Sequence, residues 1–187
     1  MGLEHKSKGD EWALSLLCVD MYVAIPPLYS MDPESGIRSS HLDPLLMRYL
    51  ESSGVDGVVL AYQNLHFHTH LAKIMYDSPV AFTPISVDLV VWRPRVGTRI
   101  AGRLSRTSPD HIGLLVWNCF NASIPRAGIP AEWVYEGEDE NGWDGWVDGE
   151  GIAIPDHLPF TIRSVVRAMG SVSLEGSLVE NAETEAD

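Results

Sequence analysis

Apolar and polar residues alternate along several segments of the first half, and this spacing predicts strands. Residues 14–25 form a long apolar run that ends at Pro26 and Pro27, which is typical of a buried strand leaving its sheet. Residues 57–62 follow an Asp-Gly turn, and residues 85–91 alternate with a period of two. These runs predict a small antiparallel sheet.

One short helix is predicted between the first two of these strands. Asp43 and Pro44 are residue types preferred at the N-cap and in the first turn of a helix, and apolar residues within 45–50 share one helical face. Gly54 follows and is expected to end this helix. Residues 29–40 are polar and rich in turn formers, so we expect a projecting loop there.

The second half reads as a small closed β-barrel. Residues 98–106 predict its first strand, in which Gly102 would allow a sharp bend. Residues 108–125 begin with a Ser-Pro turn and predict the second and third strands, and residues 158–163 predict a late strand.

The predicted fold class is therefore α+β: a small N-terminal α+β domain, with an antiparallel sheet and one helix, followed by an all-β domain. The boundary is placed near Arg93-Pro94, which gives domains 12–93 and 94–180. Residues 1–11 are expected to be a flexible N-terminus, and the acidic residues 181–187 a disordered tail.

Charge changes this picture in one segment. The 187 residues carry a net charge of −13, and residues 136–150 contain seven acids and no base. Such a stretch predicts a solvated loop that repels nucleic acid, although Trp143 and Trp146 suggest that part of it packs on the barrel or on a partner. Arginines concentrate instead between Arg93 and Arg106, at the start of the barrel.

Cysteine content and hydropathy indicate an intracellular protein. Cys18 and Cys119 lie in apolar, strand-like runs, so we expect two buried thiols in a reducing compartment and no disulfide. No apolar stretch is long enough to span a bilayer, and no membrane role is expected.

Candidate catalytic chemistry is sparse. His66, His68 and His70 would share one face of a strand, and three neutral imidazoles can hold zinc, which leaves a zinc-dependent enzyme as one hypothesis. A solvent-facing strand is favoured because no carboxylate stands nearby in sequence to orient these rings. The chain has neither a glycine-rich phosphate loop nor a nucleophile elbow. We predict no enzyme activity, no catalytic residue and no cofactor.

Nucleic-acid binding has more support. Small barrels bind single strands with aromatic and basic side chains on one face, and the candidates are Arg103, Arg106, His111, Trp117 and Phe120. Alternation points Trp117 and Phe120 in opposite directions, so at least one of them belongs to the core. A free protein that binds single-stranded RNA is one alternative, and structural arginines bordering the barrel are another.

Six strings of residues in a fixed order resemble one family, the larger stalk subunit of RNA polymerase I. That family is related to the stalk subunits of polymerases II and III and of the archaeal enzyme. Phe120–Pro125 favours the polymerase I member, while a stalk subunit of another nuclear polymerase stays an alternative. The strings are Met21–Tyr29, Gly36–Arg38, Gly57–Tyr62, Leu89–Pro94, Phe120–Pro125 and Trp146–Asp148.

The resemblance implies an OB-fold barrel and a non-catalytic role in transcription, in the nucleus and nucleolus. It implies that the N-terminal "tip" domain docks on the polymerase core subunits and that a smaller stalk subunit forms a heterodimer with the chain. It further implies that the stalk helps recruit the initiation factor for ribosomal RNA genes, with weak contact to nascent RNA. Functions housed in the longer C-terminal extension of many relatives do not carry over.

The residues chosen for core docking lie in one loop of the tip domain. Two prolines fix the path of the chain there, and an apolar residue stands beside a potential bidentate donor. The alternative is that these residues only close the tip domain. They are Pro26, Pro27, Tyr29, Gly36, Ile37 and Arg38.

Overall fold

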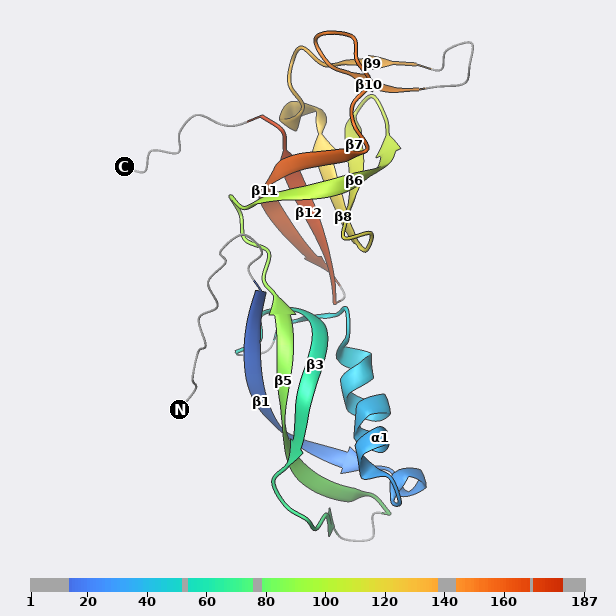
Figure 1. The fold of residues 1–187 in the computed structure, drawn as a ribbon, viewed down its shortest axis with the longest axis vertical. Coiled ribbons are helices and arrows are strands. Elements are labelled where there is room, and N and C mark those ends of the chain that lie inside the picture. Colours follow the sequence, from blue (N-terminus) through green and yellow to red (C-terminus); the bar gives the residue numbers. More distant parts are fainter. Residues whose placement is uncertain (1–13, 52–53, 76–78, 138–143, 169, 180–187) are drawn as a thin grey trace, which may run out of the picture. The chain divides into compact units, whose positions relative to one another are not determined.

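The structure is a computed structural model that describes residues 14–51, 54–75, 79–137, 144–168 and 170–179 (Figure 1). The chain divides into two compact units between Arg93 and Pro94, which we call the tip unit and the barrel unit. The described residues are mostly strands with one α-helix and several short 3-10 or π turns, among them η4 (Arg126–Gly128) in the barrel unit, and they include a closed barrel. The predicted α+β class is confirmed.

The tip unit is built on an antiparallel sheet. Its strand order is β1-β5-β3-β2, and β4 also pairs with β5. β1 and β5 stay in register over twelve residue pairs without a bulge, so the side chains of each strand alternate between the same two faces along its whole length. The bounds are β1 Leu14–Ile25, β2 Tyr49–Leu50, β3 Gly57–Phe67, β4 Lys73–Ile74 and β5 Ala81–Trp92.

The expected loop at 29–40 is wrong, and so is the helix predicted from Asp43 through 45–50: the helical segment starts at Pro27 and ends at Leu45, and Tyr49–Leu50 form strand β2. The helical segment comprises η1 Pro27–Tyr29, α1 Pro33–Ile37, a π-helical turn η2 Arg38–Leu42 and a 3-10 turn η3 Asp43–Leu45. Asp32 is the N-cap of α1, because its Oδ1 accepts from the backbone N–H of Ser35 at 3.2 Å. The second Asp-Pro pair, Asp43-Pro44, comes at the end of the segment instead of its start.

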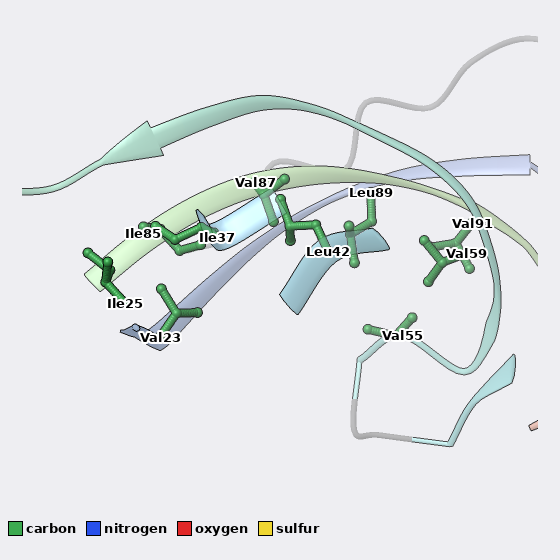
Figure 2. Packing of buried hydrophobic residues seen from close by; sticks show 10 residues of the cluster. All are labelled: Val23, Ile25, Ile37, Leu42, Val55, Val59, Ile85, Val87, Leu89 and Val91. Carbon is green, nitrogen blue, oxygen red and sulfur yellow. The ribbon is translucent and has the colours of Figure 1, made fainter. Parts of the chain in front are cut away.

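The core of the tip unit lies between this helical segment and one face of the sheet. Ile37 and Leu42 are fully buried, and Figure 2 shows them among Ile85, Val87 and Leu89 of β5. Burying one such side chain contributes about 2 kcal/mol. The second face of the sheet carries partly and fully exposed side chains, so the sheet is covered on one side within the described residues.

The barrel unit contains a closed five-stranded barrel in the order β11-β12-β8-β7-β6, with β6 pairing back to β11. All neighbours are antiparallel except β12 and β8, which are parallel. The predicted strands at 98–106, 108–125 and 158–163 are confirmed. The bounds are β6 Arg99–Thr107, β7 His111–Val116, β8 Phe120–Pro125, β11 His157–Ala168 and β12 Ser171–Ser177.

Two glycines allow close packing inside this barrel. A Cβ on Gly176 would lie 2.2 Å from Cδ2 of the buried Phe160, which only a glycine avoids. A Cβ on Gly102 would lie 2.9 Å from Cβ of Leu114. Gly102 therefore serves close approach of β6 and β7, and the break in their register falls further on, between Leu104 and Arg106.

The acidic segment is not a loop throughout. Strands β9 (Val134–Glu136) and β10 (Gly145–Val147) pair as an antiparallel ribbon, and residues 138–143 with Trp143 lie outside the described residues. Trp146 is fully buried, as predicted, and its indole N–H donates to the Ser108 carbonyl at 3.0 Å. The guanidinium of Arg126 lies 4.9 Å from the indole centroid, a cation–π contact.

The prediction that both thiols are buried is wrong. Cys18 lies on the exposed face of β1, and Cys119 lies in the turn between β7 and β8. An apolar run identifies a strand but leaves open which of its two faces is covered. The predicted N-terminus 1–11 and tail 181–187 lie outside the described residues.

Candidate functional site

The proposed docking residues divide between the core and the surface of the tip unit. Ile37 is fully buried, so it does not offer the exposed apolar contact that the sequence suggested. Gly36 is buried too, and a Cβ there would lie 2.4 Å from Cβ of Tyr29, which is half-buried. These residues close the unit around its own core.

Arg38 is exposed, but its guanidinium already has partners. Its Nη2 donates to Oε1 of Glu34 at 2.6 Å, its Nε donates to the same oxygen at 3.1 Å, and its Cζ lies 5.8 Å from the Tyr62 ring centroid. The hydrogen bond with Glu34, followed by its charge, raises the pKa of Arg38. Docking through Arg38 would have to replace this ion pair.

Apolar side chains that the sequence analysis missed lie exposed at one end of the tip unit. Leu28 follows Pro27 in η1 and is 85% exposed, and Met31 in the next turn is 95% exposed. Across the sheet, Ile74 of β4 pairs with Ala81, which itself pairs with Ile25 at the end of β1. We call the exposed residues the tip surface: Leu28, Met31, Leu71, Ile74 and Met75.

The end of the tip unit in Figure 1 at which β1 enters the helical segment also carries β4. An apolar side chain that stays in water lacks the stabilisation of about 25 cal/mol that each Å² of buried apolar surface contributes. Several such residues at one end of a unit are characteristic of a protein interface. A signal was present in the sequence, since Leu28 and Met31 stand between Pro27 and Pro33 outside any periodic run.

The five candidate RNA-contact residues do not form one patch. His111 and Trp117 lie at opposite ends of β7, about 20 Å apart along the strand. Arg103 pairs with Leu115, near Trp117, whereas Arg106 pairs with Gly113, near His111. Phe120 is buried in the barrel, so of the pair Trp117 and Phe120 it is the one that belongs to the core.

Trp117 is the candidate best placed to contact a base. It is 40% exposed, and its ring meets that of Phe120 edge-on at 6.1 Å between centroids. Trp117 and Asn118 have φ values of 50° and 57°, and the Cys119 N–H donates to the Val116 carbonyl at 3.0 Å. These are the features of a type I′ turn, which usually contains Asn and Gly, so a bulky ring at this position is strained.

His111 is held by a neighbouring turn. Its Nδ1 lies 2.9 Å from the Ser108 hydroxyl, and its backbone N–H donates to the same oxygen at 3.3 Å. Since Trp146 donates to the Ser108 carbonyl, this turn also anchors the β9–β10 ribbon. The position of His111 is therefore explained by the local fold.

His66, His68 and His70 are all exposed, but they do not assemble as a ligand set. The His66 and His68 rings lie 5.9 Å apart between centroids, and His68 Nε2 lies 3.0 Å from Ser86 Oγ and 3.5 Å from Asp20 Oδ1. β3 ends at Phe67, before His70. Within the described residues, no group of three or more metal-binding side chains is close enough to hold an ion. None of the described helices is long and apolar enough to cross a membrane.

Comparison with known proteins gives a consistent result for both units. Residues 94–179 match a family model described as the RPA43 OB domain in RNA Pol I. The DNA-directed RNA polymerase I subunit rpa43 of Schizosaccharomyces pombe is 36% identical over 166 residues, which cover 87% of this chain and 94% of that protein.

Other relatives are longer than this chain. The mouse DNA-directed RNA polymerase I subunit RPA43 is 37% identical over 115 residues, and these cover 33% of its length. A probable subunit of the same name in Dictyostelium discoideum is 26% identical over 166 residues and is covered to 46%. The chain thus spans nearly all of the fission yeast relative and less than half of these two.

Proposed function

Because the chain belongs to the RPA43 family of RNA polymerase I subunits, we propose that it is a non-catalytic stalk subunit of that polymerase and docks on the core through its tip unit. The observation that carries this proposal is the identity with the fission yeast subunit, which runs through both units. The names of the relatives support a place in transcription and in the nucleus.

The tip surface is the proposed docking contact. Leu28 and Met31 are the most exposed of its side chains, and they follow Pro26 and Pro27, which were already chosen from the sequence. Pro27 is exposed and Tyr29 half-buried, so both can contribute at the border of the contact. Buried hot-spot residues typically contribute about 2 kcal/mol or more each. Ile37 and Gly36 then support the contact by holding α1 on the sheet.

Affinity purification of the tagged chain tests this proposal. The wild-type chain is expected to co-purify with RNA polymerase I core subunits, and the double variant Leu28→Asp and Met31→Asp is expected to lose most of them. Ile152→Asp is the matched control, because Ile152 is an exposed aliphatic residue of the barrel unit. Wild-type recovery of core subunits with the tip variant would refute docking through this surface, and no recovery with the unaltered chain would refute the assembly itself.

Three finer parts of the proposal follow from the family. A smaller stalk subunit forms a heterodimer with the chain, the assembled stalk helps recruit the initiation factor for ribosomal RNA genes, and the protein resides in the nucleolus. Identification of the co-purifying proteins tests the first two parts, and fluorescence imaging of the tagged chain tests the third. A diffuse nuclear signal during active ribosomal RNA synthesis would contradict nucleolar residence.

A second candidate function is weak contact of the barrel unit with nascent RNA. Arg103 and Arg106 on β6 and the exposed Trp117 favour it, since single strands bind through phosphates and base stacking. Replacing both arginines by Glu removes two phosphate contacts, so the slope of log affinity against log salt is expected to fall by roughly 1.4 on single-stranded RNA. An unchanged slope would leave these arginines as border residues. Tight RNA binding by the free chain would favour the alternative of an independent RNA-binding protein.

A further inference from the structure

Within the described residues, the outer edge of β1 has little of the usual protection of an edge strand, since Asp20 is its one charged residue. Natural sheets shield their edges with proline, lysine, bulges or very short strands. β1 has twelve residues without proline, lysine or arginine, and its register with β5 has no break. Within the described residues no strand pairs with its other edge. The Ala24 carbonyl, near the end of β1, is hydrogen-bonded to His41 Nε2 of the helical segment at 2.7 Å.

The side chains along this edge form a row of distinct chemistry on the open face of the sheet. Alternate residues of β1 are exposed and progress from aliphatic to acidic to aromatic: Leu14, Leu16, Cys18, Asp20 and Tyr22. On β5, the partly exposed Val90, Asp88 and Pro84 pair with three of them. The open face thus has an aliphatic end, an acidic centre and an aromatic end.

Among the described residues, the acidic centre has no lysine or arginine partner. The Asp20 side chain is 79% exposed, and its one ion-pair neighbour in the described part of the chain is the His68 ring at 3.5 Å. Asp88 accepts from Asn64 Nδ2 at 2.8 Å and pairs with no Lys or Arg among the described residues. Partial removal from water, a hydrogen bond with Asp88 and the charges of Asp88 and Asp20 raise the pKa of Cys18. The negative electrostatic potential at this centre favours binding of a cationic side chain.

The aromatic end adds a second site for a cation. Tyr22 is half-exposed and its ring stacks on that of Phe82, with centroids 5.8 Å apart and planes 11° from parallel. Asp20 precedes Tyr22 by two residues, so its side chain lies on the same face of the strand. An aromatic ring beside a carboxylate suits the guanidinium of an arginine, which can stack and donate at once.

We propose that the edge of β1 from Leu14 to Tyr22 accepts an extended segment of a partner protein as an added strand. Backbone hydrogen bonds supply affinity in this mode, and alternate side chains supply specificity. The segment presents an aliphatic residue to Leu16 and an arginine or lysine to Asp20 and Tyr22. A second copy of this chain fits poorly, because it would bring its own Asp20 and Asp88 against the same charges.

Cys18 allows a direct test, because the sequence contains only two cysteines and Cys119→Ser leaves Cys18 as the single thiol. The inference rests on the proposed function, since the partner is sought in the purified polymerase assembly. Alkylation of Cys18 by iodoacetamide is expected to slow about tenfold or more in the assembly relative to the free full-length chain, because an added strand covers the row. Amide hydrogen exchange in residues 14–22 is expected to slow as well, which distinguishes strand pairing from simple coverage of the face.

A photo-crosslinker attached to Cys18 then identifies the occupant. The expected product joins Cys18 to one segment of another subunit in which aliphatic and basic residues alternate. Asp20→Lys is expected to reduce that product about tenfold, because charge reversal places two cations together, and Asp20→Asn less so. Asp110→Lys on the exposed surface of the barrel unit is the matched control and should leave the yield unchanged.

Each other outcome overturns the inference. A chain that co-purifies with the core while Cys18 stays fully reactive refutes the added strand and leaves the proposed function standing. A crosslink to a second copy, to RNA or to an acidic segment refutes the stated occupant. A chain that recovers no polymerase subunits refutes both proposals together.

Discussion

The two units of this chain differ in how the edges of their sheets are paired and how the faces are covered. In the barrel unit, five strands close on themselves through the β6–β11 pairing, so each of them has two strand neighbours. In the described part of the tip unit, the sheet stays open, β1 has a strand partner on one side, and the helical segment covers one face. Closure removes exposed edges outright, whereas an open sheet must be shielded or paired.

The difference indicates a division of labour. A closed barrel satisfies its own backbone groups and needs no partner to complete it. The tip unit exposes an unprotected edge and the apolar tip surface, both of which are unfavourable for a free protein and suitable for an assembled one. We therefore expect substitutions in the tip unit to act on assembly, and substitutions in the barrel unit to act on its own stability or on RNA.

The largest expected effect is on the core of the tip unit. Ile37→Asp places a carboxylate without a partner at a fully buried position, and this is expected to cost more than about 4 kcal/mol and to unfold the tip unit. NMR spectra of the full chain should then lose the dispersed signals of the tip unit and keep those of the barrel unit. Leu28→Asp, at an exposed position, should stay within about 0.5 kcal/mol of wild type. An intact tip unit in the Ile37→Asp chain would contradict the packing described.

The corresponding test in the barrel unit is Trp146→Ala. This change removes a buried indole, its hydrogen bond to Ser108 and its contact with Arg126, and such truncations typically cost about 3–5 kcal/mol. Trp146→Phe keeps most of the volume and should lose roughly 1–2 kcal/mol, mainly from the unsatisfied Ser108 carbonyl. Thermal unfolding of the full chain, followed by near-UV circular dichroism, measures both. A midpoint of Trp146→Phe equal to that of wild type would show that the indole N–H contributes nothing to stability.

A smaller effect is expected at Arg126, which holds the ribbon from outside. Its Cζ lies 4.9 Å from the Trp146 centroid, and Arg126→Gln should cost about 1 kcal/mol. Arg126→Lys keeps the charge and should cost less. The measurement is the free energy of unfolding from chemical denaturation, compared between variants that share the same dependence of this free energy on denaturant concentration. A stability of Arg126→Gln equal to that of wild type would mean that Trp146 is held by burial and the Ser108 bond alone.

The smallest effect compares one tyrosine from each unit. Tyr62 in the tip unit and Tyr135 in the barrel unit each donate to an aspartate, Asp43 at 2.6 Å and Asp144 at 2.7 Å, and this hydrogen bond is the main reason that both pKa values are raised. A raised pKa in the folded state stabilises the protein below a pH of about 10, and that contribution is lost as the pH rises through the folded value.

Unfolding measured between neutral and alkaline pH tests this sign. Tyr62→Phe and Tyr135→Phe should each flatten part of the alkaline loss of stability, and the double variant should flatten more than either. Both phenols are largely accessible to solvent, so the change is small in each case. If the variants lost stability more steeply than wild type at alkaline pH, the raised pKa assigned to the two tyrosines would be contradicted.

The strands could be predicted because apolar runs of this length and alternation with a period of two are characteristic of strands. The run from Leu14 to Ile25 predicted both ends of β1, and the segment 108–125 predicted β7 and β8 together without the bounds between them. The start of the helical segment could not be predicted, because Asp32-Pro33 and Asp43-Pro44 carry the same local signal. The choice between them depends on the burial of Ile37 and Leu42 against β5, which is a tertiary contact.

The candidate surfaces were less predictable than the strands for the same reason. Sequence placed Ile37 in the docking loop because an apolar residue beside an arginine resembles an interface, but packing against the sheet buries it. The exposure of Cys18 depends on the helical segment covering the opposite face of β1. Trp146 was predicted to pack because a tryptophan within a polar segment rarely stays in water.

The central claim, that the tip unit mediates assembly while the barrel unit contacts RNA, is tested most directly by crossing two variants with two readouts. Polymerase purified through the tagged chain is assayed for core subunits and, per assembled chain, for crosslinked nascent RNA. Leu28→Asp with Met31→Asp should abolish core recovery, whereas Arg103→Glu with Arg106→Glu should leave core recovery at the wild-type level and lower RNA crosslinking. Full core recovery with the tip variant, or loss of the core with the arginine variant, would contradict the division between the units.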